Sequence, residues 1–561
     1  MKVEFMVKHV VIAVLSVFAL GAHAQGTFKI SGLDDIDPWG IGTLSQAEGA
    51  LPSSLWKNSD PEDISILLTQ TRVQSLSPSM RDLVRRTVLS SSLKPEGADD
   101  LLLKKRLDII RDLGDPKVFA DYVRQIPGIE GVIPGFELSI DNEFASGNLK
   151  SACSLVRASS QQSAYLLRSR AACYAFEGDY SSAQIALEFA RDAGFQDVWF
   201  VKIVNFMSTE KQKDAPEARY DSGLTLAMSY GADLLDDKTG LAGLAPELAV
   251  QFVKRADIPR KLRIQVADIA FTAGVIEVSA YRWLYRPDPL PAKPEVTDDT
   301  QPKTDTDTDT SIDAPLPINA LDEAIAVVRN KEATDLDRAL AFHRALSLAQ
   351  FDLQRFQVVS EALAPWLNGI NNPSIIQQFG DVFALAALSI ENDALARRFA
   401  SSLQTEGSPN FDPFMAAWLD AIRIVSGNDK SPESALVVSQ KLAETADEAT
   451  KASAARMIRS FLALDLPIDQ AARKFLLIQT DDALEAGRAL SGKDLLITKA
   501  AFQSGSLGEG MLRLAVSIGN SPEDIRMSDI EEAAELLMEN NLEDEARNLL
   551  LEAVRFYRPK R

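Results

Sequence analysis

The chain has 561 residues, of which 46% are hydrophobic and 25% are charged, a composition typical of soluble globular proteins. Asp and Glu outnumber Lys and Arg by 80 to 59, and the net charge of −21 argues against binding to nucleic acid or to anionic membrane surfaces, because both attract cations. With 3 His and 2 Cys, the chain has few candidate ligands for metal sites and few partners for nucleophilic catalysis.

The N-terminal segment over residues 1–24 has the three parts of a secretory signal peptide. Lys2 and Lys8 precede an apolar run over residues 10–20, and Ala22-His23-Ala24 is a small-x-small cleavage site. We expect cleavage after Ala24 and no membrane insertion of the mature chain. The alternative, an uncleaved membrane anchor, needs an apolar span of about 20 residues, which is longer than this run. The lack of an Asn-x-Ser/Thr acceptor favours the bacterial periplasm over a eukaryotic secretory route.

After an irregular segment over residues 25–59, the pattern is helical almost throughout. Apolar residues recur at helical spacing, and several helix starts have a capping residue followed by Pro, whose missing N–H costs nothing in the first turn. These starts are Asp60-Pro61, Ser77-Pro78, Asp115-Pro116, Asn372-Pro373, Ser431-Pro432 and Ser521-Pro522. We see no convincing strand run. The sequence therefore predicts an all-α fold.

Three short motifs occur in the order used by serine penicillin-recognising enzymes. They are Ser91-x-x-Lys94, Ser146-Gly147-Asn148 and Lys238-Thr239-Gly240. In that interpretation Ser91 is the nucleophile and Lys94 is its activating base. The context argues against it, because Pro95 breaks the helix on which Ser91 and Lys94 need to lie one turn apart. We expect the three motifs to be coincidental.

The two cysteines of the chain, Cys153 and Cys173, are close in sequence and enter an oxidising compartment if the chain is exported. We expect them to form a structural disulfide. Closing a loop of about 20 residues contributes roughly 3 kcal/mol in the chain-entropy model. The alternative, a redox-active pair, is disfavoured because redox sites use Cys-x-x-Cys spacing.

The helices are arranged in pairs, most clearly over residues 164–194. Two helices rich in small residues flank a Glu-Gly-Asp-Tyr turn, and small residues at helical spacing let two backbones approach closely. The segment resembles the tetratricopeptide repeat at Ala172, Tyr174, Gly178, Tyr180, Ala183 and Ala190. Weaker copies occur at residues 379–403 and 530–556. The resemblance implies an α-solenoid of degenerate helical hairpins.

A segment rich in Pro and Asp over residues 287–317 interrupts the helical pattern. It has almost no large apolar side chains, so it cannot offset its ordering entropy and is predicted to be a disordered acidic linker. Its alternating aspartates at 305, 307 and 309 do not form an EF-hand, because Thr310 and Leu316 replace the required Gly and Glu. The linker divides the chain into helical repeat domain 1 (60–286) and helical repeat domain 2 (318–561).

Other candidate catalytic and cofactor residues have ordinary structural interpretations. His343 follows Leu336 and Leu340 at helical spacing, so we expect it to pack or to line a groove rather than to act in a triad. Gly505, Gly508 and Gly510 lack the preceding strand and following Lys of a phosphate loop, and we expect a helix connector there. We predict no catalytic residue, no cofactor and no metal ligand.

Short motifs along most of the mature chain carry a second resemblance. They are Asp35-Ile36-Asp37-Pro38, Ile41-Gly42-Thr43-Leu44, Leu55-Trp56, Ser151-Ala152-Cys153, Ala172-Cys173 and Asp544-Glu545-Ala546-Arg547. Together they resemble a family of exported alphaproteobacterial helical-repeat proteins, some of which carry the label antifreeze glycopeptide. The chain has no Ala-Ala-Thr repeat or regular threonine face, so the label carries no functional meaning here. The resemblance implies no known activity.

These features favour a non-catalytic periplasmic scaffold or adaptor. Stacked helical hairpins form grooves that bind extended peptides or partner helices, and we expect other envelope proteins or peptides as partners, with a role in envelope assembly or maintenance. The first alternative is an envelope serine enzyme that uses Ser91 and Lys94. The second is a stress-associated or ice-associated protein.

Overall fold

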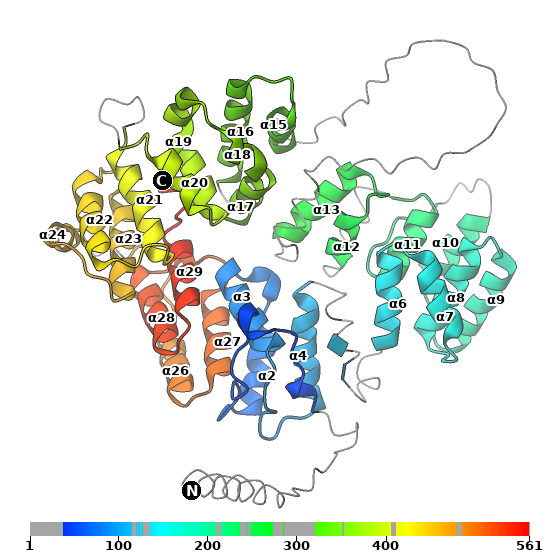
Figure 1. The fold of residues 1–561 in the computed structure, drawn as a ribbon. Helices are drawn as coiled ribbons and strands as arrows, with labels where there is room; N and C mark the ends of the chain where they lie inside the picture. The colour runs from blue at the N-terminus through cyan, green and yellow to red at the C-terminus, as the bar shows by residue number, and fades with distance from the viewer. Residues whose placement is uncertain are drawn as a thin grey trace, which may run out of the picture.

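The computed structural model describes residues 37–114, 135–208, 215–235, 248–272, 320–350, 353–404, 411–479 and 485–559, with a few isolated positions between them. The regular structure in these ranges is helical, and the β contact found there is a single parallel bridge between Arg488 and Ile525. The predicted all-α class is confirmed (Figure 1). The predicted signal peptide (1–24) and linker (287–317) lie outside the described residues. Within the described ranges, no helix is both long enough and apolar enough to cross a membrane.

The helices of the described ranges can be taken along the chain in five groups. The first group is α2 (Pro61–Gln70), α3 (Pro78–Leu89) and α4 (Asp100–Asp112). The second is α6 (Gly135–Ala145), α7 (Leu149–Ala158), α8 (Ala164–Phe176), α9 (Tyr180–Asp192), α10 (Val198–Ser208) and α11 (Gly223–Gly231). The third is α12 (Ala249–Lys254) and α13 (Arg260–Thr272).

The C-terminal part contains the remaining two groups. The fourth is α15 (Ala320–Arg329), α16 (Asp335–Ala349), α17 (Leu353–Ala362), α18 (Ala364–Gly369), α19 (Pro373–Ser389), α20 (Asp393–Ala400), α21 (Pro413–Val425), α22 (Pro432–Thr445), α23 (Lys451–Ala463) and α24 (Gln470–Ile478). The fifth is α26 (Gly492–Gln503), α27 (Leu507–Ile518), α28 (Met527–Glu539) and α29 (Glu543–Ala553). Short 3-10 helices are η2 (Pro38–Gly40), η3 (Gln46–Glu48), η4 (Val73–Ser75) and η8 (Pro522–Asp524).

The predicted helix starts can be compared directly with the structure. Four α-helices begin at the predicted Pro, with the preceding side chain accepting a backbone N–H of the first turn: Asp60, Ser77, Asn372 and Ser431. Ser521-Pro522 begins only the three-residue η8, because the chain becomes extended at Ile525, which takes part in the bridge to Arg488. Asp115-Pro116 lies outside the described residues. The same signature at Asp412-Pro413, which begins α21, was overlooked.

Successive helices form side-by-side pairs joined by tight turns. The pairs include α8/α9, α19/α20, α21/α22, α26/α27 and α28/α29. Each turn contains one residue with positive φ, which reverses the chain after the last helical turn. These residues are Gly178, Glu391, Gly427, Gly505 and Asn541. Three of them lie in the turns that the sequence predicted for the repeat-like segments. Gly505 is the predicted connector, whereas Gly508 and Gly510 lie inside α27.

The buried apolar side chains form two hydrophobic cores. The smaller core lies within residues 140–228 and is built by α6 to α11. The larger core takes residues from 39–126, 218–284 and 324–557. N-terminal and C-terminal segments therefore share one core.

The N-terminal helices α2 and α3 pack against α27 and α29, a contact that we call the N–C joint (Figure 1, blue against orange and red). Backbone hydrogen bonds cross it from Gly508 N to Leu55 O at 2.8 Å and from Ser77 N to Gly519 O at 2.9 Å. Apolar packing between the first and last helices removes surface that two separate arrays would expose to water.

A second contact links the residues before and after 287–317. Arg260 on α13 forms a bidentate ion pair with the buried carboxylate of Asp322 on α15, with Nη2–Oδ1 2.6 Å and Nη1–Oδ2 3.1 Å. Like the N–C joint, this contact connects residues of the predicted domains 60–286 and 318–561, a division that stays a prediction. The sequence pattern located a break in composition at 287–317, but tertiary packing continues across it.

A buried carboxylate contributes to the N–C joint. Glu552 of α29 accepts hydrogen bonds from Ser79 N at 2.7 Å and from Ser79 Oγ at 2.6 Å, in the first turn of α3. Burial raises the pKa of Glu552 to about 7, although the bonds from Ser79 oppose this change, and the nearby Glu523 carboxylate adds to it. Glu552 therefore connects the packing of the first and last helices to proton binding.

We expect Glu552→Gln to remove a pH dependence of the free energy needed to open the N–C joint. The folded-state pKa lies above the ordinary 4.5, so the folded state keeps a proton that the unfolded state releases. The free energy of opening should therefore fall as pH rises from about 4.5 to about 7, by about 3 kcal/mol relative to the variant. Hydrogen–deuterium exchange in α3 and α29 at pH 5 and pH 8 measures this difference. If protection in the wild type and in Glu552→Gln changed equally between pH 5 and pH 8, Glu552 would not be the group that makes the joint depend on pH.

Candidate functional site

The predicted disulfide is present and joins α7 to α8. Cys153 and Cys173 are bonded, with their Cα atoms 5.6 Å apart, and both side chains are buried in the smaller core. The bond links two helices that already pack against each other. Its position in the core agrees with a structural role, in which the bond constrains the unfolded chain.

Reduction of this disulfide should loosen α7 and α8. The loop closed by the bond spans 20 residues, so its loss should lower the free energy of local opening by about 3 kcal/mol. Hydrogen–deuterium exchange in α7 and α8, with and without reductant, measures the change. A Cys153→Ala/Cys173→Ala double variant is the control, since reductant should not affect it. Unchanged protection of the wild type after confirmed reduction would refute the prediction.

A buried carboxylate caps the start of α11 from α6. Asp141 accepts hydrogen bonds from Gly223 N at 2.7 Å, Leu224 N at 3.0 Å and the Tyr165 hydroxyl at 2.9 Å. Burial raises the pKa of Asp141, although these donors oppose the change. Asp141 therefore fixes the start of α11, directly after the segment 215–222, against α6 and α8.

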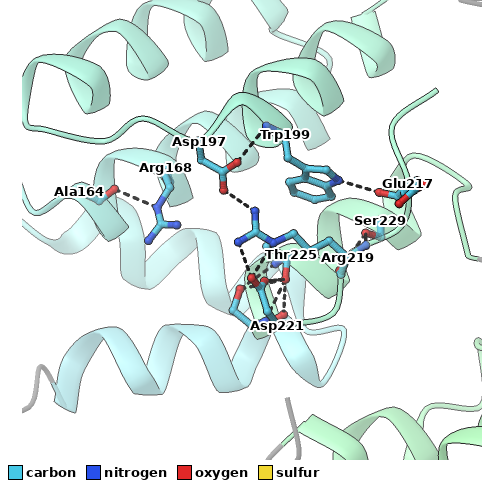
Figure 2. Close-up of polar contacts among 10 residues, drawn as sticks. Ala164, Arg168, Asp197, Trp199, Glu217, Arg219, Asp221, Thr225 and Ser229 are labelled. Atoms are coloured by element: carbon cyan, nitrogen blue, oxygen red, sulfur yellow. Dashed lines mark hydrogen bonds and ion pairs between the residues drawn. The ribbon is translucent and has the colours of Figure 1, made fainter. Parts of the chain in front are cut away.

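That segment carries Arg219, which forms ion pairs with two carboxylates (Figure 2). The distance from Arg219 Nη1 to Asp197 Oδ2 is 2.6 Å, and that from Nη2 to Asp221 Oδ2 is 2.5 Å. Burial opposes the charged form of Arg219, but the hydrogen bonds and charges of Asp221 and Asp197 outweigh it and raise the pKa. The Arg219 side chain is thereby fixed between α10 and α11.

Trp199 completes this network at the start of α10. Its indole Nε1 donates to Glu217 O at 2.7 Å, and its backbone N–H donates to Asp197 Oδ1 at 2.9 Å (Figure 2). The Arg219 guanidinium lies over the indole ring, 5.6 Å from its centroid. Asp197 thus caps α10 and pairs with Arg219, so the 195–197 turn between α9 and α10 is held in one conformation.

A pocket of about 500 Å³ lies between α9 and α10 beside this turn, and we call it the α9/α10 groove. Its lining residues are Gln184, Leu187, Glu188, Arg191, Phe195, Gln196, Asp197, Val198, Val201 and Asn205. Val198 and Val201 are 69% and 44% exposed, although they lie on a helix whose opposite side is buried in the core. The lining combines apolar side chains, amides and charges, which suits the recognition of a peptide segment.

The predicted serine motifs do not assemble into a site in the described residues. Ser91 and Lys94 lie in an irregular segment after α3 rather than one turn apart on a helix, and Ser91 Oγ donates to Gly40 O at 2.6 Å. Residues 146–148 form the turn between α6 and α7. Residues 238–240 lie outside the described residues. The helix required by the Ser91/Lys94 interpretation is therefore missing at these two positions.

His343 lies on α16 and is partly exposed, with its ring 5.4 Å from that of Phe379. This agrees with the predicted packing role. Leu336 and Leu340, which the sequence placed on a buried stripe with His343, are 48% and 47% exposed. That part of the prediction is wrong, because α16 buries a different face that includes Phe342 and Leu346. No group of three or more His, Cys, Asp or Glu suited to a metal ion occurs in the described ranges.

No protein-family model, curated protein or solved structure matches the chain. The function of the chain is therefore inferred from the geometry of the α9/α10 groove.

The sequence patterns considered above do not predict the α9/α10 groove or the Arg219 network. A signal was present in the segment 198–208, VWFVKIVNFMS, which is apolar on more than one helical face. Phe200, Ile203 and Val204 fill the core, which leaves Val198 and Val201 as additional apolar residues. Apolar residues that one buried face does not require are candidates for an interaction surface.

Proposed function

We propose that this protein is a non-catalytic scaffold or adaptor of the cell envelope, which binds protein partners through the α9/α10 groove. The observation that carries the proposal is the exposed apolar surface of Val198 and Val201 beside a turn held by the Asp197–Arg219 ion pair. A preorganised groove loses little conformational entropy when a partner binds. Paired helices that stack along the chain are typical of tetratricopeptide-like solenoids, whose grooves bind peptides.

Export is part of the same proposal. The signal-like segment 1–24 supports it, and a buried disulfide is typical of proteins that mature in oxidising compartments. The ion pairs of the Arg219 network are satisfied within the chain, so they hold the groove in shape rather than act on a substrate. Envelope proteins or peptides are the partners that this compartment offers.

A charge placed in the groove tests this function. Val201→Asp places an unpaired carboxylate beside the apolar side chains of the groove. The full chain with this substitution should no longer capture the partner in cross-linked pull-downs from the periplasm. Val437→Asp on α22 is the matched control, because Val437 is similarly exposed at 50% and lies far along the chain from the groove. Equal recovery of partners by the two variants would contradict the proposal. The full chain is required, because separate halves would expose the shared core at the N–C joint.

A further inference from the structure

A second guanidinium lies beside the α9/α10 groove, and within the part of the chain that the structure describes it forms no ion pair with a carboxylate. Arg168 on α8 has its Cζ 4.5 Å from the centroid of the Phe195 ring, which also lines the groove. Its Nε donates to Ala164 O at 3.4 Å (Figure 2). Its two terminal nitrogens form no hydrogen bond to another of the described residues. Phe195 therefore supports Arg168 and forms part of the groove wall.

Two carboxylates in this region, Asp141 and Asp197, are already hydrogen-bonded to other donors. Asp141 accepts hydrogen bonds from two backbone N–H groups and from the Tyr165 hydroxyl. The positive charge of Arg168 lowers the pKa of Asp141, but burial outweighs this effect. Asp197 is bonded to Arg219 and to Trp199 N. Arg168 therefore keeps free donors in a planar group that is held in place by stacking on an aromatic ring. Such a group is suited to a bidentate bond with a carboxylate.

We propose that Arg168 binds a carboxylate of the partner, so that the segment recognised by the α9/α10 groove has an acidic side chain close to its apolar anchor. The inference rests on the proposed function. In this arrangement an apolar side chain of the partner packs beside Val198 and Val201. The partner's backbone then passes over the turn at Phe195 and places an Asp or Glu side chain next to Arg168. Phe195, which contacts Arg168, lies three positions before Val198, so their Cα atoms are at most about 11 Å apart. An extended chain advances about 3.3–3.6 Å per residue, so the two anchors should lie about two to four residues apart.

Selection from a phage library of random dodecapeptides on the full-length protein tests this inference. The peptides selected on the wild type should carry Asp or Glu two to four residues from a large apolar residue. Their affinity should fall about tenfold or more for Arg168→Gln, recover in part for Arg168→Lys, and stay unchanged for Lys150→Gln, an exposed cation on α7. Added salt should weaken the binding of these peptides to the wild type, because salt screens the ion pair with Arg168. This measurement tests the ion pair without any variant.

The outcomes separate the inference from the proposed function. Peptides that require Val201 but bind Arg168→Gln as tightly as the wild type, without salt dependence, would leave the groove function standing and overturn the role of Arg168. A selection that yields no peptide sensitive to Val201→Asp would overturn both.

Discussion

Arg106→Met should lower the free energy of unfolding by about 3 kcal/mol. The Arg106 guanidinium is fully buried, and it donates to Val88 O and Ser90 O at 2.9 Å each and to Trp39 O at 3.3 Å. Methionine has similar bulk but no donor, so the carbonyls lose charge-assisted bonds of about 1.5 kcal/mol or more each. The release of a buried charge offsets part of this loss.

The unfolding midpoint in urea, followed by circular dichroism, measures the effect of Arg106→Met. The matched control is Arg344→Met on α16, because Arg344 is 57% exposed and its ion pair with Glu323 is long, at 3.5 Å. A surface substitution of this kind should stay within about 0.5 kcal/mol of the wild type. If the two variants had the same midpoint, the buried hydrogen bonds of Arg106 would not stabilise the fold as expected.

Gly223→Ala should have an effect of similar size, on the candidate site itself. A Cβ atom at position 223 would lie 1.9 Å from the carbonyl oxygen of Asp141, a backbone atom that cannot move without displacing α6. Forcing the start of α11 away from α6 should cost about 2–3 kcal/mol and break the hydrogen bond from Gly223 N to Asp141. Hydrogen–deuterium exchange in α6 and α11 should report this loosening.

Gly492→Ala provides an internal control, because Gly492 is also the first residue of a helix. A Cβ atom there meets nothing within 4 Å, so the substitution should be neutral or stabilise by up to about 1 kcal/mol. Equal exchange in the two variants would show that the close approach of α6 and α11 is not needed. Because the segment before Gly223 carries Arg219, loosening it should also weaken capture of the partner by the groove.

Local chemistry predicted much of the secondary structure. Pro after a capping side chain marked the starts of α2, α3, α19 and α22, and polar turn residues marked the reversals at Gly178, Glu391 and Asn541. The cysteine pair was also predictable, because its sequence spacing limits how far apart the two residues can lie. These features depend on residues close together in the chain.

Features that depend on distant residues could not be predicted in this way. Glu552 and Ser79 are 473 positions apart, and nothing in either local sequence indicates that they meet in the N–C joint. To predict the groove, one would need to know which face of α10 the core covers, because Val201 and Val204 have equal hydropathy but different burial. The exposed Leu336 on α16 shows the same limit, because periodicity predicts a face without saying which neighbour covers it.

Photocross-linking from the groove in living cells tests the central claim most directly. A benzoylphenylalanine residue placed at Val198 lies at the groove and should form a discrete covalent adduct with a partner protein on irradiation. The same residue placed at Leu496 on α26 is the matched control, since the two side chains are 69% and 67% exposed. The account predicts an adduct at Val198 that is absent at Leu496 and is lost when Val201→Asp is added. No adduct at Val198, or the same adducts at both positions, would contradict a scaffold that binds its partner through this groove.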